Sequence, residues 1–235
     1  MTAAALELHG VSSGYGEAVV VREVALDIRP GEIFVLLGKN GMGKSTLLKT
    51  VMGFLPIRSG TIRVSGEDIT GQPPHRIARR AIAYTPQEQS LFQDLSVVEN
   101  LQLAVRNEGR LRAGLRRMGE IFPFIPQRLK QRAGTLSGGE QKMLLIARAL
   151  MSAPRLVLVD EITEGLQPSV VQKLAAVLTA EREQAGTAML LIEQHVTFAL
   201  EVADRYAVLK LGEIVDRGAA VDAGAEQRIT AHLSV

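Results

Sequence analysis

The segment FVLLGKNGMGKSTLLKTVMG, residues 34–53, joins an apolar run to a helix-forming run through a turn rich in glycine. Residues 33–37 are typical of a buried strand, and the residues from Lys44 onward favour a helix. Between them, Gly38 to Ser45 fits the pattern G-x-x-x-x-G-K-[ST], in the strand-turn-helix context that this phosphate-binding loop requires. The segment therefore predicts a site for ATP or GTP within an α/β fold.

The phosphate loop assigns roles to its own residues. Backbone N–H groups from Gly41 to Lys44 are expected to cradle the phosphates, because a helix N-terminus carries unpaired donors and a partial positive charge. We expect Lys44 to reach the β- and γ-phosphates and the Ser45 hydroxyl to bind Mg²⁺. The positions expected to contact the nucleotide here are Gly38, Asn40, Gly41, Gly43, Lys44, Ser45 and Thr46.

A second apolar run predicts the metal ligand and the activation of water. Residues 156–159, LVLV, are typical of a buried parallel strand, which ends in Asp160 and Glu161. Ligand sites of open α/β sheets lie at the carboxyl ends of strands, where this pair falls. Successive strand residues point to opposite sides, so the two acids should differ in role. We expect Asp160 to hold the magnesium shell and Glu161 to orient or deprotonate the attacking water.

A third segment, TLSGGEQKMLLIARALM at residues 135–151, begins a helix with two glycines. Ser137 and Glu140 have the spacing of a capping box, and by itself this pattern indicates a well-capped core helix. That interpretation leaves Gly138 and Gly139 unexplained, since a glycine inside a helix costs about 1 kcal/mol relative to alanine. Close approach of a ligand to the backbone would explain them, and a helix N-terminus favours an anion.

Together these motifs resemble those of the nucleotide-binding subunits of ABC transporters. The resemblance covers nearly the whole chain and rests, in order, on SGYGE, the phosphate loop, YTPQEQ, LSGGEQ, LVLVDE and LLIEQH. LSGGE is its specific element, because phosphate loops occur in many families. The resemblance implies one ABC ATPase domain over residues 1–235 that binds ATP and Mg²⁺. Its expected fold is a P-loop core with a mainly parallel sheet, an antiparallel β subdomain and an inserted helical subdomain.

The resemblance also implies a dimer that sandwiches two ATP molecules. Ser137, Gly138 and Gly139 of one subunit would meet the γ-phosphate held by the phosphate loop of the other. Residues 163–168, TEGLQP, would form the loop that crosses the dimer interface. A monomer is then expected to bind ATP but to hydrolyse it poorly.

Further roles follow from individual positions of the resemblance. Tyr15 corresponds to the aromatic residue that stacks on adenine, although a packing residue before a turn is the alternative. Gln87 corresponds to the glutamine that contacts magnesium and water. Residues 91–101, LFQDLSVVENL, resemble the segment that faces the membrane partner.

Two positions depart from the pattern of the family. Ile162 replaces the usual proline after the Asp-Glu pair, a change we expect to be tolerated. The histidine that contacts the γ-phosphate should follow the last core strand, where the alignment of strand ends places Gln194, with His195 one residue late. Either Gln194 serves this role or the strand end shifts to present His195, which would otherwise be a surface residue at a helix start.

The pattern of apolar and turn residues predicts the organisation of the chain. An antiparallel lobe is followed by alternating elements of an α/β core, and the stretch of about residues 89–149 lacks strand-like runs and is read as a helical insertion. The expected elements are strands at 6–11, 19–28 and 60–66, then strand 33–37, helix 44–52, strand 81–85, strand 156–159, helix 169–184 and strand 187–192.

Composition excludes several classes of protein. The 235 residues include no cysteine and only four scattered histidines, which excludes disulfides, thiolate metal sites and a zinc spacing. No apolar run approaches 18 residues and no export signal is evident, so a place in the reducing cytoplasm is expected.

An excess of arginine between residues 106 and 132 has three interpretations. It could be a solvated helix face, a contact with anionic headgroups beneath a membrane, or a nucleic-acid patch. Sparse aromatic residues argue against stacking on single strands, so direct binding of nucleic acid is not expected. The basic residues in question are Arg106, Arg110, Arg112, Arg116, Arg117, Arg128, Lys130 and Arg132.

The leading functional interpretation is an ATPase subunit that powers an ABC importer from the inner face of the membrane. GKNGMGKSTLLKTVMG, TEGLQP and LLIEQ look most like the subunits of importers for branched-chain amino acids, amides or urea. The implied partners are multi-span permease subunits, a second ABC ATPase in a homodimer or heterodimer, and, indirectly, an external solute-binding protein. The alternative is a non-transport ABC ATPase that acts on nucleic acid or the ribosome. Repair members of this kind carry zinc cysteines, chromosome organisers carry long coiled coils, and translation factors generally fuse two ATPase units. None of these features is found in this sequence.

Overall fold

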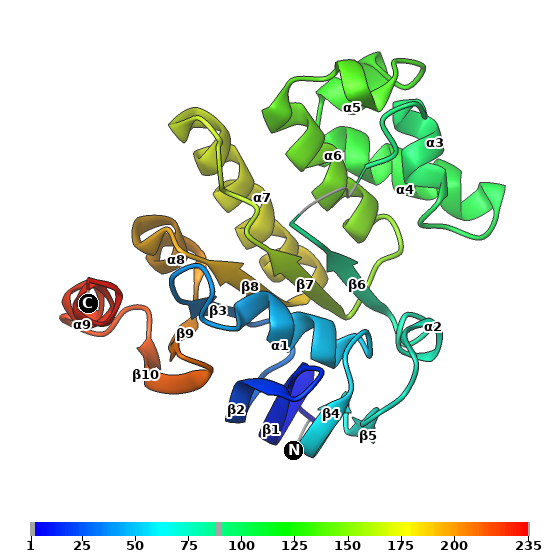
Figure 1. The fold of residues 1–235 in the computed structure, drawn as a ribbon. Coiled ribbons are helices and arrows are strands. Elements are labelled where there is room, and N and C mark those ends of the chain that lie inside the picture. The colour runs from blue at the N-terminus through cyan, green and yellow to red at the C-terminus, as the bar shows by residue number, and fades with distance from the viewer. Residues whose placement is uncertain (1–2, 88–90, 235) are drawn as a thin grey trace.

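The computed structural model describes residues 3–87 and 91–234, which form two sheets with helices around them (Figure 1). A four-stranded antiparallel sheet has the order β2-β1-β4-β5, and a six-stranded sheet has the order β10-β9-β3-β8-β7-β6. The strands are β1 (Leu6–Tyr15), β2 (Ala18–Ile28), β3 (Ile33–Leu37), β4 (Ile57–Val64), β5 (Glu67–Asp68), β6 (Ile82–Thr85), β7 (Leu156–Asp160), β8 (Ala188–Glu193), β9 (Arg205–Lys210) and β10 (Glu213–Ala219). The mainly parallel sheet and the separate antiparallel lobe confirm the predicted fold class.

The centre of the six-stranded sheet is covered on both faces, and its strands β3, β7 and β8 are buried along their whole length. Strands β3, β6, β7, β8 and β9 run parallel, and only β10 pairs antiparallel with β9. In β3, Val35 and Leu37 join the hydrophobic cluster formed with the large helices, whereas Phe34 and Leu36 join the cluster beneath the antiparallel sheet. This alternation follows from the two-residue period of a strand.

The helices divide between the core and an upper lobe (Figure 1). Their bounds are α1 (Lys44–Val51), α2 (Pro74–Ile77), α3 (Val97–Gln102), α4 (Glu108–Ile121), α5 (Phe124–Gln127), α6 (Gly138–Leu150), α7 (Pro168–Ala185), α8 (Val196–Val202) and α9 (Ala225–Leu233), with a 3-10 turn at Ala133–Thr135. From residue 91 to 150 the structure has helices and turns, and its strand-like pairing there is a single bridge between Ser96 and Arg132. Gln89, where we expected the helical insertion to begin, lies outside the described residues.

The sequence interpretation missed the end of the sheet. It assigned no elements after residue 192, yet β9, β10, α8 and α9 lie there, and β9 pairs directly with β3 in the centre of the sheet. Predicted boundaries also shift by one to four residues: β1 extends to Tyr15, and α7 spans Pro168–Ala185 rather than 169–184. The apolar run YAVLKLG with its terminal glycine is the hairpin signal that the interpretation passed over.

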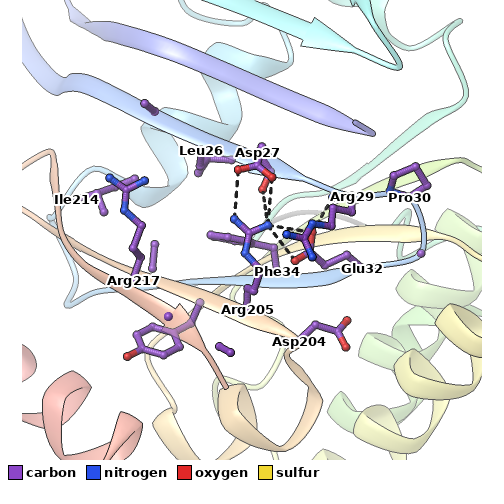
Figure 2. Close-up of a pocket in the computed structure, with 16 residues that line it drawn as sticks. Leu26, Asp27, Arg29, Pro30, Glu32, Phe34, Asp204, Arg205, Ile214 and Arg217 are labelled. Atoms are coloured by element: carbon purple, nitrogen blue, oxygen red, sulfur yellow. Dashed lines mark hydrogen bonds and ion pairs between the residues drawn. The ribbon is translucent and has the colours of Figure 1, made fainter. Parts of the chain in front are cut away.

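One arginine ties the two sheets together beside a cavity of about 660 Å³ (Figure 2). Arg205 on β9 pairs with Asp27 on β2 at 3.1 Å and with Glu32 at 3.2 Å. Its guanidinium lies 5.4 Å from the centroid of the Phe34 ring, a distance that allows a cation–π contact. The pairing with Arg205 lowers the pKa of Asp27. No residue of the phosphate loop lines this cavity. We therefore assign Arg205 a structural role, which is to hold the two sheets together through its ion pairs.

Candidate nucleotide-binding site

The phosphate loop leaves the end of β3 and enters α1 through two glycines in left-handed conformation. Gly41 has φ 81° and Gly43 has φ 101°, values that residues with side chains rarely adopt. Gly43 occupies the cap position of α1, and no side chain caps this helix start. The N–H groups of the first turn are therefore available to an anion at the positive end of the helix.

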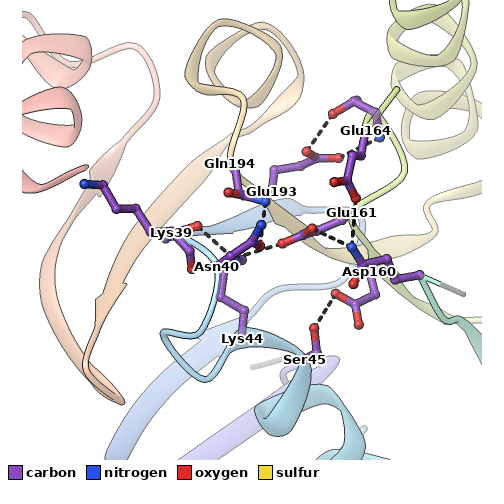
Figure 3. Close-up of polar contacts among 12 residues, drawn as sticks. Lys39, Asn40, Lys44, Ser45, Asp160, Glu161, Glu164, Glu193 and Gln194 are labelled. Atoms are coloured by element: carbon purple, nitrogen blue, oxygen red, sulfur yellow. Dashed lines mark hydrogen bonds and ion pairs between the residues drawn. The ribbon is translucent and has the colours of Figure 1, made fainter. Parts of the chain in front are cut away.

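Lys44 is the first residue of α1, and its side chain is 3% exposed (Figure 3). Its ammonium donates to the carbonyl of Gly38 at 2.7 Å and to that of Lys39 at 3.0 Å. It also forms an ion pair with Glu161 at 3.0 Å, and the Glu161 side chain is only 4% exposed. The lysine that we expect to bind the phosphates is thus paired with the carboxylate that we expect to orient the water.

The candidate magnesium ligands meet across the gap between α1 and β7 (Figure 3). The Ser45 hydroxyl donates to Asp160 Oδ1 at 2.9 Å. Burial raises the pKa of Asp160, with the hydrogen bond from Ser45 acting in the opposite direction. Hydroxyl and carboxylate oxygens are the donors that Mg²⁺ prefers, so the residues present fit this ion. Within residues 3–87 and 91–234, no group of three His, Cys, Asp or Glu side chains could hold a metal ion.

Glu161 is fixed by its backbone as well as by its side chain. It has φ 48°, a strained value for a residue other than glycine, and its N–H donates to the carbonyl of Ile192 at 3.0 Å. Gln87 donates from Nε2 to Glu161 at 2.9 Å and to Glu164 at 2.8 Å. Ile162, in the place of the usual proline, is 1% exposed and packs in the hydrophobic core.

The structure distinguishes Gln194 from His195, the two candidates that follow β8. Gln194 donates from Nε2 to Asn40 Oδ1 at 2.8 Å, which brings it against the phosphate loop (Figure 3). His195 is exposed, occupies the cap position of α8 and makes no side-chain capping bond there. Strand β8 ends at Glu193, one residue before Gln194. Of the two candidates, Gln194 is the one that contacts a residue of the phosphate loop.

Glu193 is a buried acid that the sequence interpretation did not single out. Its carboxylate accepts from the Thr163 hydroxyl at 2.7 Å and from the Thr163 N–H at 3.3 Å. Burial raises the pKa of Glu193 to about 7, against the effect of the Thr163 bonds. The contact ties the start of the 163–168 loop to the strand end that presents Gln194. The sequence signal for this residue is the acid that ends the apolar run LLIE at residues 190–193.

The glycines at the start of α6 have different surroundings. Ser137 and Glu140 form the predicted capping box, in which the Ser137 N–H donates to Glu140 at 3.0 Å. A Cβ at Gly139 would lie 3.0 Å from Val170 on α7, so contact within the chain explains this glycine. A Cβ at Gly138 would meet nothing within 4 Å. Packing within the chain therefore explains why residue 139 is a glycine. The glycine at position 138 is still explained by the approach of a ligand.

The start of α6 does not contact the phosphate loop of the same chain. In Figure 1, α6 belongs to the upper lobe and α1 to the core below it. The described hydrogen bonds of the Ser137 side chain all involve Glu140, and its carbonyl accepts from the N–H of Gln141. Tyr15, by contrast, lies at the end of β1 with 47% of its surface exposed, which leaves its ring accessible to a flat ligand.

Comparison with known proteins places these features among those of one family. The family described as ABC transporter matches residues 21–164. The high-affinity branched-chain amino acid transport ATP-binding protein BraG of Pseudomonas aeruginosa is 41% identical over 220 residues, covering 92% of this chain and 94% of BraG. The probable branched-chain amino acid transport ATP-binding protein LivF of Archaeoglobus fulgidus is 35% identical, covering 89% and 90%.

Two further comparisons concern an exporter subunit and a solved structure. The lipopolysaccharide export system ATP-binding protein LptB of Escherichia coli is 35% identical, covering 92% of this chain and 90% of LptB. The crystal structure of the ADP conformation of MJ1267, an ATP-binding cassette of an ABC transporter, superposes with a TM-score of 0.86 at 25% identity, covering 99% of this chain and 96% of MJ1267.

Proposed function

The chain belongs to the ABC transporter family of ATP-binding proteins, and from this premise we propose that it powers an importer of branched-chain amino acids or related amides. As a member of this family, it is an ATPase. The observation that carries the proposal is the convergence of Lys44, Ser45, Asp160 and Glu161, at the carboxyl ends of β3 and β7, in a chain 41% identical to a branched-chain amino acid transport subunit.

In the proposed mechanism the phosphate loop binds ATP first. The N–H groups of Gly41 to Thr46 surround the phosphates, and Lys44 exchanges Glu161 for the β- and γ-phosphate oxygens. Tyr15 stacks on the adenine. Ser45, Asp160 and Gln87 would hold Mg²⁺, which when bound neutralises charge on the phosphate oxygens.

Release of Glu161 from Lys44 prepares the second step. The freed carboxylate orients a water molecule towards the γ-phosphorus and accepts its proton as the bond to the β-phosphate oxygen breaks and ADP leaves. Gln194, whose Nε2 donates to Asn40 of the phosphate loop, is assigned to donate its amide N–H to the γ-phosphate. An amide cannot accept a proton in exchange, so the role of Gln194 is to orient.

The site becomes complete only with a second ATPase subunit. We place Ser137, Gly138 and Gly139 against the γ-phosphate of the opposite subunit, because the start of α6 offers a capped helix N-terminus with open space over Gly138. The loop of residues 163–168 lies between the two sites and is tied to β8 through Glu193. The second subunit is a copy of this chain or a related ATPase.

The remaining partners follow from the same proposal. ATP-binding subunits of this family work with membrane permeases, and we place this chain on the cytoplasmic face of the membrane beneath multi-span permease subunits. An external solute-binding protein would deliver the substrate to them. No helix of the described residues is long and apolar enough to cross a membrane.

Uptake by intact cells tests the proposal. Cells of the source organism that lack this chain should lose most saturable uptake of radiolabelled leucine, and the wild-type chain should restore it. Glu161→Gln should not restore uptake, although it is made in equal amount. Normal leucine uptake without the chain would refute the proposed substrate class.

A further inference from the structure

Glu193 is a buried acid to which the proposed mechanism gives no role. It ends β8, is 2% exposed, and follows an apolar run from Ala188 to Ile192 that is buried throughout. A carboxyl group in such surroundings costs free energy unless its oxygens are hydrogen-bonded. Both oxygens are used here, because Oε1 accepts from the Thr163 N–H at 3.3 Å and Oε2 accepts from the Thr163 hydroxyl at 2.7 Å. Glu193 therefore serves one segment of the chain, the turn that follows β7.

The bonds between Glu193 and Thr163 lie where the pairing of two strands stops. Strands β7 and β8 pair in parallel up to Asp160 and Ile192, and the Glu161 N–H still donates to the carbonyl of Ile192 at 3.0 Å. At this point β7 has ended and the chain turns at Glu161, whose φ is 48°. Two residues further on, Thr163 bonds to the Glu193 side chain. The carboxylate thus takes the place that a strand carbonyl has within the ladder.

The turn at Glu161 needs support on both sides, because a left-handed conformation is strained for a residue with a side chain and persists only where its surroundings impose it. On one side, the Glu161 N–H is bound to Ile192. On the other side, Ile162 is buried but lacks the ring with which a proline would fix its own φ. The two bonds from Thr163 to Glu193, which lies next to Glu161 in Figure 3, supply the constraint on that side.

We infer that Glu193 is a positioning residue for ATP hydrolysis, which sets the direction of the Glu161 carboxylate by anchoring Thr163. The inference rests on the proposed function, in which Glu161 orients the attacking water. In this role Glu193 acts through the backbone of the turn and not on the substrate. Thr163 also begins the 163–168 loop, where its carbonyl accepts from the Leu166 N–H at 3.2 Å, so the same anchor fixes the start of that loop.

Two substitutions of Glu193 in the full chain separate hydrogen bonding from packing. Glu193→Met keeps an unbranched side chain but offers only a weak acceptor. It should lower kcat on the order of 100-fold, the loss expected when a catalytic group is misplaced by about 1 Å. The affinity for ATP in calorimetry should not fall, because the phosphate loop is intact. Glu193→Gln should keep turnover near that of the wild type, since its amide oxygen can accept from the Thr163 N–H and its amide nitrogen can donate to the Thr163 hydroxyl.

Thr163→Val and Thr187→Val form a matched pair of variants. Just before the start of β8, the Thr187 hydroxyl donates to the buried Glu181 at 2.8 Å, as the Thr163 hydroxyl donates to Glu193. Each valine removes one hydroxyl bond to a buried carboxylate with little change of shape, so both variants should lose thermal stability to a similar extent. Only Thr163→Val should lower kcat, by about tenfold, because its N–H still holds part of the turn. Thr163→Ser keeps the hydroxyl and should hydrolyse ATP as the wild type does.

A double variant tests whether Glu193 acts through Glu161. Residual hydrolysis of radiolabelled ATP is followed in a single turnover for Glu161→Gln and for Glu161→Gln/Glu193→Met. Residues that act as a unit have non-additive effects, so the second substitution should not slow the first variant further. A further loss as large as that in the wild-type background would show that Glu193 acts independently of Glu161, and it would overturn the inference.

The outcomes separate this inference from the proposed function. Wild-type kcat in Glu193→Met, or a Glu193→Gln variant as slow as Glu193→Met, would overturn the positioning role and leave the proposed importer subunit intact. If Glu193→Met does not fold, the two threonine variants decide, and equal kcat in Thr163→Val and Thr187→Val would overturn the role. Full turnover by Glu161→Gln would overturn the proposed function of Glu161 and this inference together.

Discussion

The buried pair of Lys44 and Glu161 makes the stability of the nucleotide-free protein depend on the carboxylate that we propose to orient the water. Glu161→Gln removes the negative charge that faces Lys44 at 3.0 Å, where both side chains are less than 5% exposed. Breaking one side of a buried ion pair costs roughly 3–5 kcal/mol, because the remaining charge is left uncompensated. Lys44 keeps the carbonyls of Gly38 and Lys39, so we expect a loss near the lower limit, about 3 kcal/mol.

Thermal unfolding of the nucleotide-free protein measures this loss. For a domain of this length, 1 kcal/mol shifts Tm by roughly 2–4 °C, so Glu161→Gln should lower Tm by roughly 6–12 °C. The double variant Lys44→Met/Glu161→Gln removes both charges and should recover most of that loss. ATP should also bind Glu161→Gln more tightly than the wild type, because no carboxylate competes with the phosphates for Lys44.

A neighbouring acid provides the matched control. Glu164 is exposed and, among the described residues, accepts from Gln87, so Glu164→Gln should change the free energy of unfolding by less than about 0.5 kcal/mol. If nucleotide-free Glu161→Gln is as stable as the wild type, Glu161 does not hold Lys44 in solution. The proposed step, in which Lys44 leaves Glu161 and binds the phosphate oxygens, would then have no support.

Three further predictions concern single residues of the site. Lys44→Ala should weaken ATP binding at least tenfold in calorimetry, since it removes the ammonium assigned to the phosphates; unchanged affinity would count against that role. Gln194→Ala should reduce ATP turnover and His195→Ala should not, because only Gln194 contacts the phosphate loop, and the reverse result would shift the assignment by one residue. The raised pKa of Glu193 stabilises the folded state fully below pH 4.5, and this contribution is lost as pH rises through about 7. In denaturant unfolding, the free energy of unfolding of the wild type should therefore fall by up to about 3 kcal/mol relative to that of Glu193→Gln between pH 5 and 8. If the free energies of both proteins change in parallel with pH, Glu193 is not the titrating group.

The sequence was sufficient for the parts of the site that depend on short-range pattern. Phosphate loops and acids at strand ends converge because the carboxyl ends of parallel strands meet at one edge of a sheet, which brings Ser45 within 2.9 Å of Asp160. The capping box of Ser137 and Glu140 is likewise local, and the structure has it.

Features that depend on tertiary neighbours could not be predicted from the sequence. Thr163 and Glu193 are 30 residues apart, and their hydrogen bond requires β7 and β8 to be adjacent strands. The contact of Gly139 with Val170 depends on how α6 and α7 pack. Strands β9 and β10 were missed although the run YAVLKLG carries a local signal for them, but the pairing of β9 with the central β3 depends on the tertiary fold.

The central claim is that ATP is hydrolysed between two ATPase subunits, and the mass of the chain in solution tests it most directly. Light scattering of Glu161→Gln should give 25.4 kDa without nucleotide and twice that mass with Mg-ATP, because bound ATP that is not hydrolysed holds two chains together. Gly138→Asp, at a position with no neighbour within 4 Å in the chain, should fold normally and prevent the dimer by placing a carboxylate against the γ-phosphate. A mass of 25.4 kDa for Glu161→Gln at saturating Mg-ATP would contradict a sandwich of two copies of this chain.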